Sequence, residues 1–566
     1  MRGNSFVMYL DQFNTLSPNH AKIYDEYMLE NDTVAYEFRV ETAVEKTIIQ
    51  RLESNPGHVI LTGNAGDGKT RLCRTIYNHF SIEGGLESWP SEGIVECSFD
   101  KGRLRIVKDL SELRDDVIER ELLRMQSLIE ENTEHIYYVI AANEGKLTKF
   151  LSQHSSLDVL ARDVRRRFES YHHNTATLAI YNLLDVTSSV YLEKVLDEWT
   201  KEENWESCKA CPRQKRCIIH LNHTRMKQPV VKNRMVEQYR MLDFLAIHLT
   251  MRELLIHMSY VFTGGYTCID VLEANYQQIE QQIEKVYYQN FFGVGVSEGA
   301  FSEIKAFEVF VYQDPGKQAD GEIDDFILNG DISGDEELEQ ANLSLFNQDL
   351  DMYRGYFVRQ LQLYRDHDQA TRQDFMLWFP RLRRKIYFEF LEGIPLAVER
   401  LIPYQYIREY KQALEDSRFR KQIRKKLISG LNRTFSQRLV ESGDVLYATN
   451  RNLLIYGRYY DDRVSVMVQE KRQDIDHLSS HMFLQVKESR LLVNLYIFEY
   501  LFRIANGGTF NLLKQETNIL IDTFKNELIR ISSVDDEEDL YILRLDPEAG
   551  EYVRDEISIV GGHGYD

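Results

Sequence analysis

The sequence is poor in the residues and runs that mark secreted or membrane proteins. It has only six cysteines and ten prolines among 566 residues. No apolar run approaches the roughly 18 residues that a membrane span needs, and the opening MRGNSFVMYLDQFN lacks the apolar core of a signal peptide. So few cysteines in so long a chain do not form the disulfide framework of a secreted protein. These absences predict a cytoplasmic protein that does not use a membrane.

Basic residues are outnumbered by acidic ones. Asp and Glu total 89 and Lys and Arg total 68, which gives a net charge of −21. The chain as a whole therefore does not attract nucleic acid, and any such binding needs a local basic face. Apolar residues make up 43 % and aromatic residues 11 %, which excludes a disordered chain and allows several cores. A usual domain size of roughly 150 residues predicts three or four domains.

The strongest motif is GNAGDGKT at residues 63–70. A short apolar run, Val59 to Leu61, precedes it, and apolar residues at helical spacing follow it. A strand, a glycine-rich loop and a helix in this order are the context that a nucleotide-binding P-loop requires. The glycines let several backbone N–H groups point at one anion, and the helix adds its positive end. The motif predicts that a triphosphate is bound by Gly63, Asn64, Ala65, Gly66, Asp67, Gly68, Lys69 and Thr70.

Two residues of the motif have specific chemical roles. Lys69 reaches the β- and γ-phosphates of ATP, and the Thr70 hydroxyl binds Mg²⁺. Hydrolysis also needs a carboxylate that is linked to the metal. The strand-like stretch LRIVKDLSEL at 104–113 becomes polar at Asp109. Because the carboxyl ends of parallel strands meet beside the ligand, Asp109 is the candidate; an ordinary strand-end aspartate is the alternative.

A second strand-like stretch supplies candidates for positioning the attacking water. HIYYVIAANEG at 135–145 is apolar until Asn143 and Glu144. We expect Asn143 to orient the water or the γ-phosphate, and Glu144 or Glu112 to act as the base. A further strand within TLAIYNLLDV at 177–186 continues the alternation of strands and helices. The alternation predicts an α/β domain with a parallel, doubly wound sheet and helices on both faces.

Residues 35–265 resemble the AAA+ and STAND branches of the P-loop ATPases. The resemblance implies a lid of helices that carries an arginine back to the phosphates. Residues 235–265 are strongly helical and hold Arg252, which matches the lid arginine; a solvated helix arginine explains it equally well. The resemblance also implies an arginine that reaches the neighbouring subunit of a homo-oligomer. The three arginines at 165–167 match that place, and a solvated basic edge is the plainer explanation.

Three of the six cysteines cluster within residues 205–223. Cys208, Cys211 and Cys217 have the spacing C-x2-C-x5-C, and His220 follows closely. Soft thiolates at such short spacing can close a tetrahedral Zn²⁺ site with one histidine. We therefore expect these four residues to bind a structural zinc. Free thiols on an exposed loop are the alternative, and an iron–sulfur cluster is disfavoured because a fourth thiol is missing nearby.

The second half of the chain carries no catalytic or nuclease signature. The stretch 314–340 has ten acidic residues and one lysine, which predicts a solvated loop or linker. Residues 341–440 are expected to be helical. Residues 445–468 are expected to form strands with a hairpin at YYDDRVSV, and a second hairpin is expected within 540–560.

One basic stretch stands out in this half. Residues 418–438 hold eight basic residues and no acidic one. Arg420, Lys421, Arg424 and Lys425 would share a helix face that can follow the phosphate backbone of DNA. An acidic partner, or the acidic loops of this protein itself, would fit the same face equally well.

GNAGDGKT, IVKDLSEL, AANEG, the cysteine cluster and LNRTF at 431–435 together resemble a group of bacterial anti-phage defence ATPases, the DptF/DndF component of phosphorothioation-dependent DNA restriction. The resemblance implies an ATPase subunit that works with partner proteins which sense or cleave unmodified DNA. The expected organisation is an ATPase core at 1–195, a helical lid with the cysteine cluster at 196–265, a connecting region at 266–345, and a C-terminal α+β domain for partners or nucleic acid at 346–566. The alternative is a scaffold that binds ATP as a switch, hydrolyses it slowly and recruits an effector.

Overall fold

The computed structural model describes residues 3–15, 17, 20, 40–82, 84–347, 349–366, 375–391, 393–394, 396–440, 443–509, 515–532 and 540–557. The chain divides into two compact units. The first unit comprises Met1–Arg240, His248–Pro403 and Arg472–His477. The second unit comprises Met241–Ile247, Tyr404–Lys471 and Leu478–Asp566. No helix among the described residues is long and apolar enough to cross a membrane.

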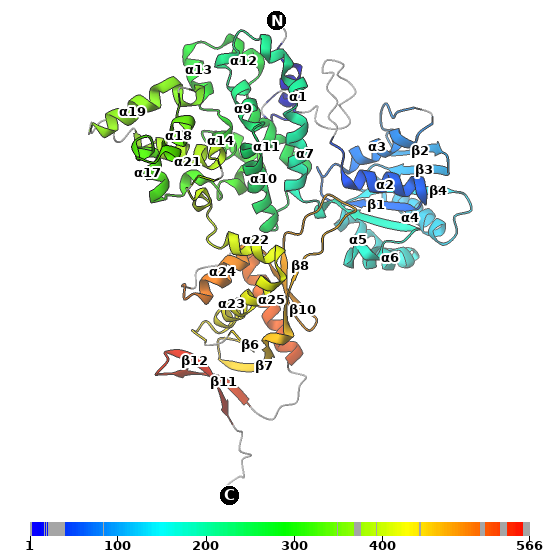
Figure 1. The fold of residues 1–566 in the computed structure, drawn as a ribbon. Helices are drawn as coiled ribbons and strands as arrows, with labels where there is room; N and C mark the ends of the chain where they lie inside the picture. The colour runs from blue at the N-terminus through cyan, green and yellow to red at the C-terminus, as the bar shows by residue number, and fades with distance from the viewer. Residues whose placement is uncertain are drawn as a thin grey trace. The chain divides into compact units, whose positions relative to one another are not determined.

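A five-stranded sheet forms the centre of the first part of the chain (Figure 1). Its order is β2-β3-β4-β1-β5, and β3, β4, β1 and β5 run parallel. The prediction of a parallel sheet is wrong at one edge, where β2 pairs antiparallel with β3. The two residues between them are too few for the crossover that a parallel pair needs. The strands are β1 (His58–Thr62), β2 (Ile94–Phe99), β3 (Gly102–Val107), β4 (Ile136–Ala142) and β5 (Leu178–Asn182).

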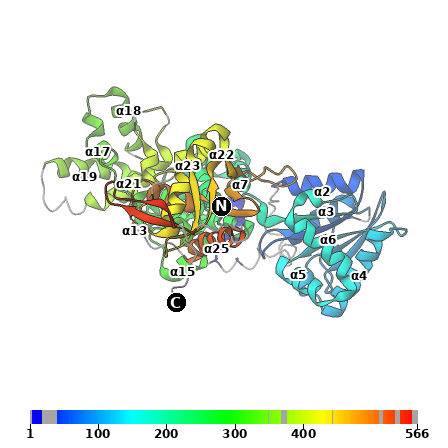
Figure 2. The ribbon, with the colours of Figure 1, turned by 90° about the horizontal axis from the view of Figure 1, so that it is seen from below.

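Helices cover both faces of this sheet, as expected (Figure 2). Val59 and Leu61 of β1 point to one face, and Ile60 points to the other, because successive side chains of a strand alternate. One core contains α2 (Ala43–Ser54) and α3 (Lys69–Phe80). The other core contains α4 (Asp115–Glu130), α5 (Glu144–Gln153) and α6 (Asp158–Glu169).

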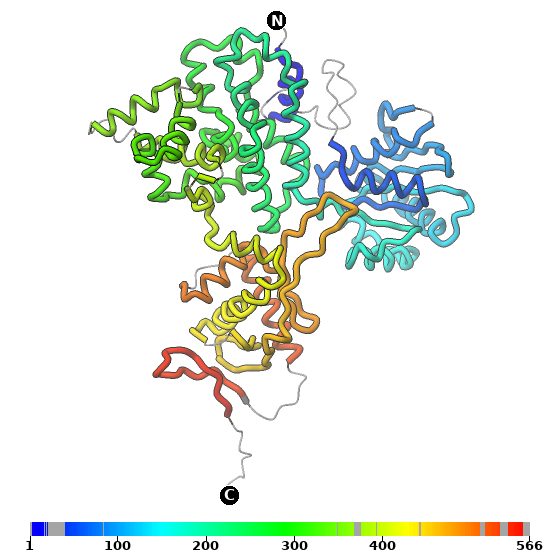
Figure 3. Tube along the Cα trace, in the orientation of Figure 1, coloured from blue at the N-terminus to red at the C-terminus, as the bar shows by residue number. Residues whose placement is uncertain are grey.

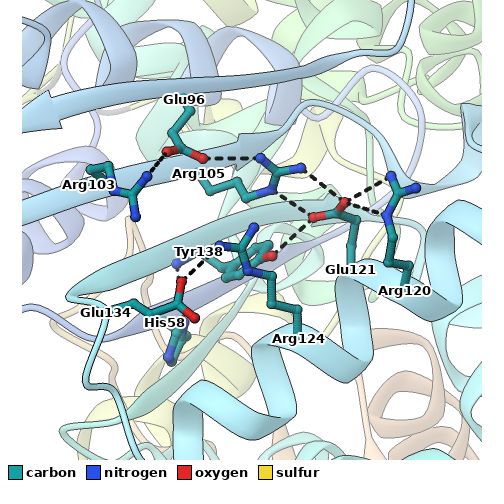
Figure 4. A network of polar contacts seen from close by, with 9 residues as sticks. All are labelled: His58, Glu96, Arg103, Arg105, Arg120, Glu121, Arg124, Glu134 and Tyr138. Atoms are coloured by element: carbon teal, nitrogen blue, oxygen red, sulfur yellow. Dashed lines mark hydrogen bonds and ion pairs between the residues drawn. The ribbon is translucent and has the colours of Figure 1, made fainter.

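A charged network crosses from β3 to α4 (Figure 4). Glu121 of α4 is 2 % exposed, and its two carboxylate oxygens accept from Nε and Nη2 of Arg105 at 2.7 and 3.0 Å. The Tyr138 hydroxyl of β4 donates to the same carboxylate at 3.0 Å. This buried carboxylate is therefore paired and hydrogen-bonded, which a charge in the interior requires.

Helices make up the rest of the first unit. They are α1 (Ser5–Asp11), α7 (Ser188–Trp199), α8 (Glu202–Trp205), α9 (Ile218–Met226), α10 (Pro229–Phe244, which runs into the second unit), α11 (Met251–Thr263), α12 (Cys268–Glu273), α13 (Tyr276–Ile283), α14 (Tyr287–Asn290), α15 (Glu298–Glu303), α16 (Lys305–Phe310), α17 (Gly321–Asn329), α18 (Glu336–Leu345), α19 (Tyr356–Arg365) and α21 (Trp378–Glu389).

The acidic stretch 314–340 is not the predicted solvated linker. It contains all of α17 and the first half of α18, and two of its carboxylates pair with arginines of α21. Asp314 accepts from Nε and Nη2 of Arg384 at 2.7 and 2.8 Å, and both side chains are buried. Asp324 accepts from Nε and Nη2 of Arg383 at 2.8 and 2.7 Å. The prediction failed because it treated the acidic run alone, whereas its basic partners lie later in the chain.

The second unit contains two antiparallel sheets, β12-β11-β7-β6 and β10-β9-β8. Because β7 and β8 belong to different sheets, the predicted hairpin at YYDDRVSV is wrong: η12 (Asp461–Arg463) carries the chain between them. The hairpin predicted within 540–560 is confirmed as β11 and β12 up to Ile557, and 558–560 lie outside the described residues. The strands are β6 (Val445–Thr449), β7 (Leu454–Tyr460), β8 (Val464–Val468), β9 (Met482–Val486), β10 (Ser489–Val493), β11 (Leu540–Asp546) and β12 (Glu551–Ile557).

Four helices accompany these sheets: α22 (Ile407–Glu415), α23 (Ser417–Ser436), α24 (Leu495–Ala505) and α25 (Gln515–Ser532). Residues 418–436 of the basic stretch lie on α23, as expected, and Arg438 follows the end of the helix. Part of its charge is used within the unit, since Arg424 pairs with Asp461 at 2.9 Å and Lys425 pairs with Asp444 at 2.5 Å. Both pairs are partly or largely exposed to solvent, so they weaken the basic face without removing it.

A short segment between β8 and β9, Arg472–His477, belongs to the first unit. Figure 3 traces the chain through this segment in orange. The carbonyl of Asp476 accepts from the backbone N of Thr187 at 2.8 Å, and its carboxylate accepts from the backbone N of Ala43 at 2.9 Å. Arg472 donates to Asp185 at 2.7 Å. These contacts attach residues 472–477 to the start of α2 and to the segment that follows β5.

Candidate functional site

The glycine loop, residues 63–68, lies between the carboxyl end of β1 and the first residue of α3. Gly63, Gly66 and Gly68 have φ angles of +148°, +99° and +82°, which residues with a Cβ rarely adopt. Asn64 and Ala65 are exposed, and Asp67 is buried. The carboxylate of Asp67 accepts from the backbone N of Asn64 at 2.6 Å, so it closes the loop from inside.

Lys69 is the first residue of α3 and folds back over the glycine loop. Its Nζ donates to the carbonyl oxygens of Gly63 and Asn64 at 2.8 and 2.7 Å. Burial is the largest influence on this side chain and lowers the pKa of Lys69, while Asp67 and Asp109 act in the opposite direction. The ammonium group is therefore held at the concave side of the loop, where an anion would compete with the two carbonyl oxygens. Thr70, the next residue, is half-buried.

The start of α11 packs against the glycine loop. The backbone N of Arg252 donates to the carbonyl of Gly66 at 3.1 Å, and His248 Nε2 lies 2.9 Å from Asp67 Oδ1. Thr250 and Glu253 form a capping box that starts the helix here, which explains why the helical stretch 235–265 is divided into α10 and α11. Arg252, predicted from the resemblance, is thus beside the loop, whereas His248 had no motif to mark it.

This contact gives a first prediction, on Gly66. A Cβ at this position would lie 3.0 Å from Thr250 Oγ1, in addition to the strain of a positive φ. Gly66→Ala is expected to lower the free energy of unfolding by about 1–2 kcal/mol and to speed hydrogen exchange at the Arg252 amide. Gly84→Ala is the matched control, since its φ is +112° and no atom lies within 4 Å of the added Cβ. If both variants leave the Arg252 amide equally protected, α11 does not depend on Gly66.

The carboxyl ends of β4 and β5 lie beside the loop. Asn143 and Glu144 line an open cavity of about 680 Å³ together with Gly63 and Asn64. The Asn143 side chain caps α5 by accepting from the backbone N of Lys146 at 3.2 Å. Glu144 accepts from Asn182 Nδ2 at 3.2 Å. Asn143 and Glu144, which are predicted to position water, therefore share one cavity with the glycine loop. Since β1 lies between β4 and β5, the carboxyl ends of these three strands are neighbours, which is where ligands bind in such sheets.

Asp109 follows β3 and caps the turn η2 (Leu110–Glu112), where its carboxylate accepts from the backbone N of Ser111 at 2.7 Å. It lies near enough to Lys69 to raise the pKa of that ammonium group, against the larger effect of burial. Lys146 Nζ donates to the carbonyl of Ser111 at 2.8 Å and ties this turn to α5. The rival base Glu112 is instead paired with Lys108 at 3.0 Å.

The three arginines at 165–167 do not share one environment. Arg167 is buried, and its guanidinium donates to the carbonyls of Asp163 and Leu178 and to Thr175 Oγ1 at 2.7, 3.2 and 3.1 Å. It is therefore used inside the fold. Arg165 and Arg166 are exposed, and a role toward a neighbouring subunit stays a prediction for them alone.

The cysteine cluster lies in the helical part of the first unit. Cys208, Cys211 and Cys217 line one cavity, and His220 lines it too, with Nε2 at 3.2 Å from Gln214 Nε2. In the part of the chain that the structure describes, no group of three or more His, Cys, Asp or Glu side chains is arranged to hold one metal ion. The zinc site of these four residues stays a prediction.

Comparisons of the chain with family models, with curated proteins and with solved structures find no match.

Proposed function

We propose that the glycine loop binds the phosphates of ATP. The observation that carries the proposal is the loop itself: three glycines at positive φ between a buried strand and a helix, with Lys69 held over the concave side. Such a loop presents several N–H groups to one anion, and the N-terminus of α3 adds a positive potential. Lys69 would exchange its two carbonyl acceptors for the β- and γ-phosphates.

We propose ATP hydrolysis at the same place. Mg²⁺ would be held by the Thr70 hydroxyl and by Asp109, and it would neutralise charge on the phosphates. Asn143 would orient the attacking water, and Glu144 would take its proton. Binding would also be felt by α11, because the backbone of Arg252 contacts Gly66 directly. A change at the phosphates is thereby linked to the helices that follow, the kind of coupling that a molecular switch needs.

The expected setting is a multi-protein bacterial defence complex that acts on DNA, in which ATP turnover drives assembly or DNA engagement. This setting rests on the resemblance to the DptF/DndF component and on the basic face of α23. The alternative is a switch that hydrolyses ATP slowly and recruits an effector without touching DNA. Arg424 and Lys425 pair with acidic residues of their own unit. These pairs leave less basic charge on α23 to bind DNA, which favours the alternative.

The base gives the second prediction. Glu144→Gln is expected to leave ATP affinity within about threefold and to lower the hydrolysis rate by about 10²-fold or more, because the amide cannot accept the proton of water. Glu112→Gln is the matched control, since its carboxylate pairs with Lys108 rather than lining the cavity beside the loop. Both are measured as steady-state phosphate release at saturating MgATP. If Glu144→Gln hydrolyses ATP at the normal rate and Glu112→Gln hydrolyses it slowly, then Glu112 is the base and Glu144 is not.

The effect of DNA on the hydrolysis rate distinguishes the two settings. If the protein works on DNA, duplex or single-stranded DNA should raise the hydrolysis rate of the wild type, and added salt should remove the effect. A rate that is indifferent to DNA, with ATP-dependent binding to a partner retained, would support the scaffold instead. No hydrolysis and no affinity for ATP in a folded sample would refute the proposed function altogether.

A further inference from the structure

A cavity of about 290 Å³ in the first unit is lined by four cysteines rather than three. The cysteine cluster supplies Cys208, Cys211 and Cys217, and the fourth thiol is that of Cys268, the first residue of α12. The other two cysteines of the chain, Cys73 and Cys97, are buried in the core beside the five-stranded sheet. Four of the six cysteines therefore line the same cavity.

Backbone and amide N–H groups point at three of these sulfurs. The backbone N of Asn4 donates to Cys268 Sγ at 3.3 Å, and Asn4 Nδ2 donates to Cys208 Sγ at 3.3 Å. The backbone N of His220 donates to Cys217 Sγ at 3.5 Å, where Cys217 caps α9. Donors placed in this way stabilise a thiolate more than a thiol, and hydrogen bonds to sulfur are one means by which proteins tune iron–sulfur clusters.

The close approach of Asn4 depends on the residue before it. A Cβ on Gly3 would lie 2.5 Å from the Cβ of Cys268, so a larger side chain cannot occupy this place without a shift. The lack of a side chain at Gly3 therefore lets the N–H groups of Asn4 reach the sulfurs of Cys208 and Cys268. The segment that carries these donors is also anchored, because Phe6 of α1 packs edge-on against Trp199 and Trp205.

The segments that carry the thiols have little core of their own. The turns η6 (Glu206–Ala210) and η7 (Gln214–Arg216) contain no buried residue, yet they hold a definite path from α8 to α9. Irregular segments without an apolar core are commonly held by a disulfide or a metal. A group bound to all four thiols would tie these turns to α9 and α12.

The ligand set and its hydrogen bonds bear on what that group is. A structural Zn²⁺ is closed by four ligands drawn from cysteine and histidine. An iron–sulfur cluster holds its thiolates farther apart, around a core of iron and sulfide, and Cys₄ is its usual ligand set. A cavity lined by four thiols, three of which accept N–H hydrogen bonds, fits the cluster.

We propose that Cys208, Cys211, Cys217 and Cys268 bind an iron–sulfur cluster that fixes the segment between α8 and α9 to α12. Each thiol gives up its proton when it binds iron. His220 is not a ligand in this assignment and keeps its contact with Gln214. The sequence places only three thiols close together, and the fold adds Cys268 as the fourth, so the ligand set of a cluster is complete.

The test is the metal content of the full-length protein purified without oxygen. The wild type should contain iron and acid-labile sulfide in equal amounts, about two to four of each per chain, with the broad visible absorption of such clusters. Cys268→Ser should lose most of the iron, the sulfide and the absorption. His220→Ala should keep all three, and Cys97→Ala controls for the loss of a cysteine outside the cavity.

Two further measurements keep the proposal falsifiable if Cys268→Ser is unstable. Apoprotein of the wild type should regain the visible absorption when supplied with ferrous iron and sulfide. Asn4→Ala should retain iron but change the reduction potential, because it removes one N–H···S hydrogen bond. Zinc at one per chain without iron, a folded wild type that holds neither metal, or full iron content in Cys268→Ser would each overturn the proposal.

Discussion

Lys69→Ala is expected to lower the affinity for ATP by about 30-fold to a few thousand-fold and to abolish measurable hydrolysis. The Lys69 side chain is buried against the glycine loop, where its ammonium group would meet the phosphates. Truncating one partner of such a buried charge contact costs about 2–5 kcal/mol, and every 1.4 kcal/mol corresponds to about a factor of ten. Calorimetric titration with MgATP and a phosphate-release assay measure the two effects.

Lys46→Ala is the control for the loss of a lysine in the same part of the fold. Lys46 lies on α2, is largely exposed and pairs with Glu41 at 2.9 Å. Its removal should leave both ATP affinity and hydrolysis unchanged within error. Thermal unfolding should show that Lys69→Ala remains folded. Wild-type affinity in Lys69→Ala would mean that the glycine loop binds something other than a triphosphate, or nothing.

Arg105→Ala is expected to cause the largest loss of stability among simple substitutions on the sheet. It would leave Glu121 buried without its bidentate partner, with Arg120 at 3.2 Å and the Tyr138 hydroxyl at 3.0 Å as remaining contacts (Figure 4), at a cost of about 3 kcal/mol. Arg103→Ala is the matched control on the same strand, because Arg103 pairs with Glu96 at 3.0 Å with about half of its side chain exposed. Its loss should cost less than about 1 kcal/mol. Chemical denaturation at neutral pH gives both values.

The same network predicts a pH dependence. Burial acts to raise the pKa of Glu121, but hydrogen bonding and attraction from Arg105 outweigh it, so the pKa lies below its usual value. The network therefore contributes its stability above the pKa of an unfolded glutamate, about 4.3, and loses it as the pH falls through the lowered folded pKa. In Arg105→Ala the contacts of Arg105 that lower the pKa of Glu121 are lost, so this pKa rises and the folded state gains a proton more easily.

The deficit of Arg105→Ala relative to the wild type should consequently be greatest near neutral pH and shrink as the pH is lowered toward 4. Denaturation series at several pH values would reveal the narrowing. A deficit that stays constant with pH would show that lost packing of the arginine side chain, and not the loss of its ion pair with Glu121, causes the destabilisation.

The local features around the five-stranded sheet could be predicted from the sequence because they depend on neighbours in the chain. The apolar run before Gly63, the glycine spacing and the helical periodicity after Lys69 each concern a few successive residues, and β1 and α3 lie where they indicate. The polar residues at strand ends, Asp109 and Asn143, were found for the same reason. The antiparallel edge strand β2 was missed, because its direction depends on a two-residue connection rather than on its composition.

Other features depended on residues far apart in the chain. The sequence by itself determined the glycine loop, the strands around it and the three clustered cysteines, since spacing and apolar pattern act over short distances. Only the tertiary structure brought His248 to Asp67, Arg384 to Asp314, Arg472 to Asp185 and Cys268 to the other thiols. Such pairings depend on how separate helices pack and which buried charges must meet, and no local pattern in the chain encodes those choices.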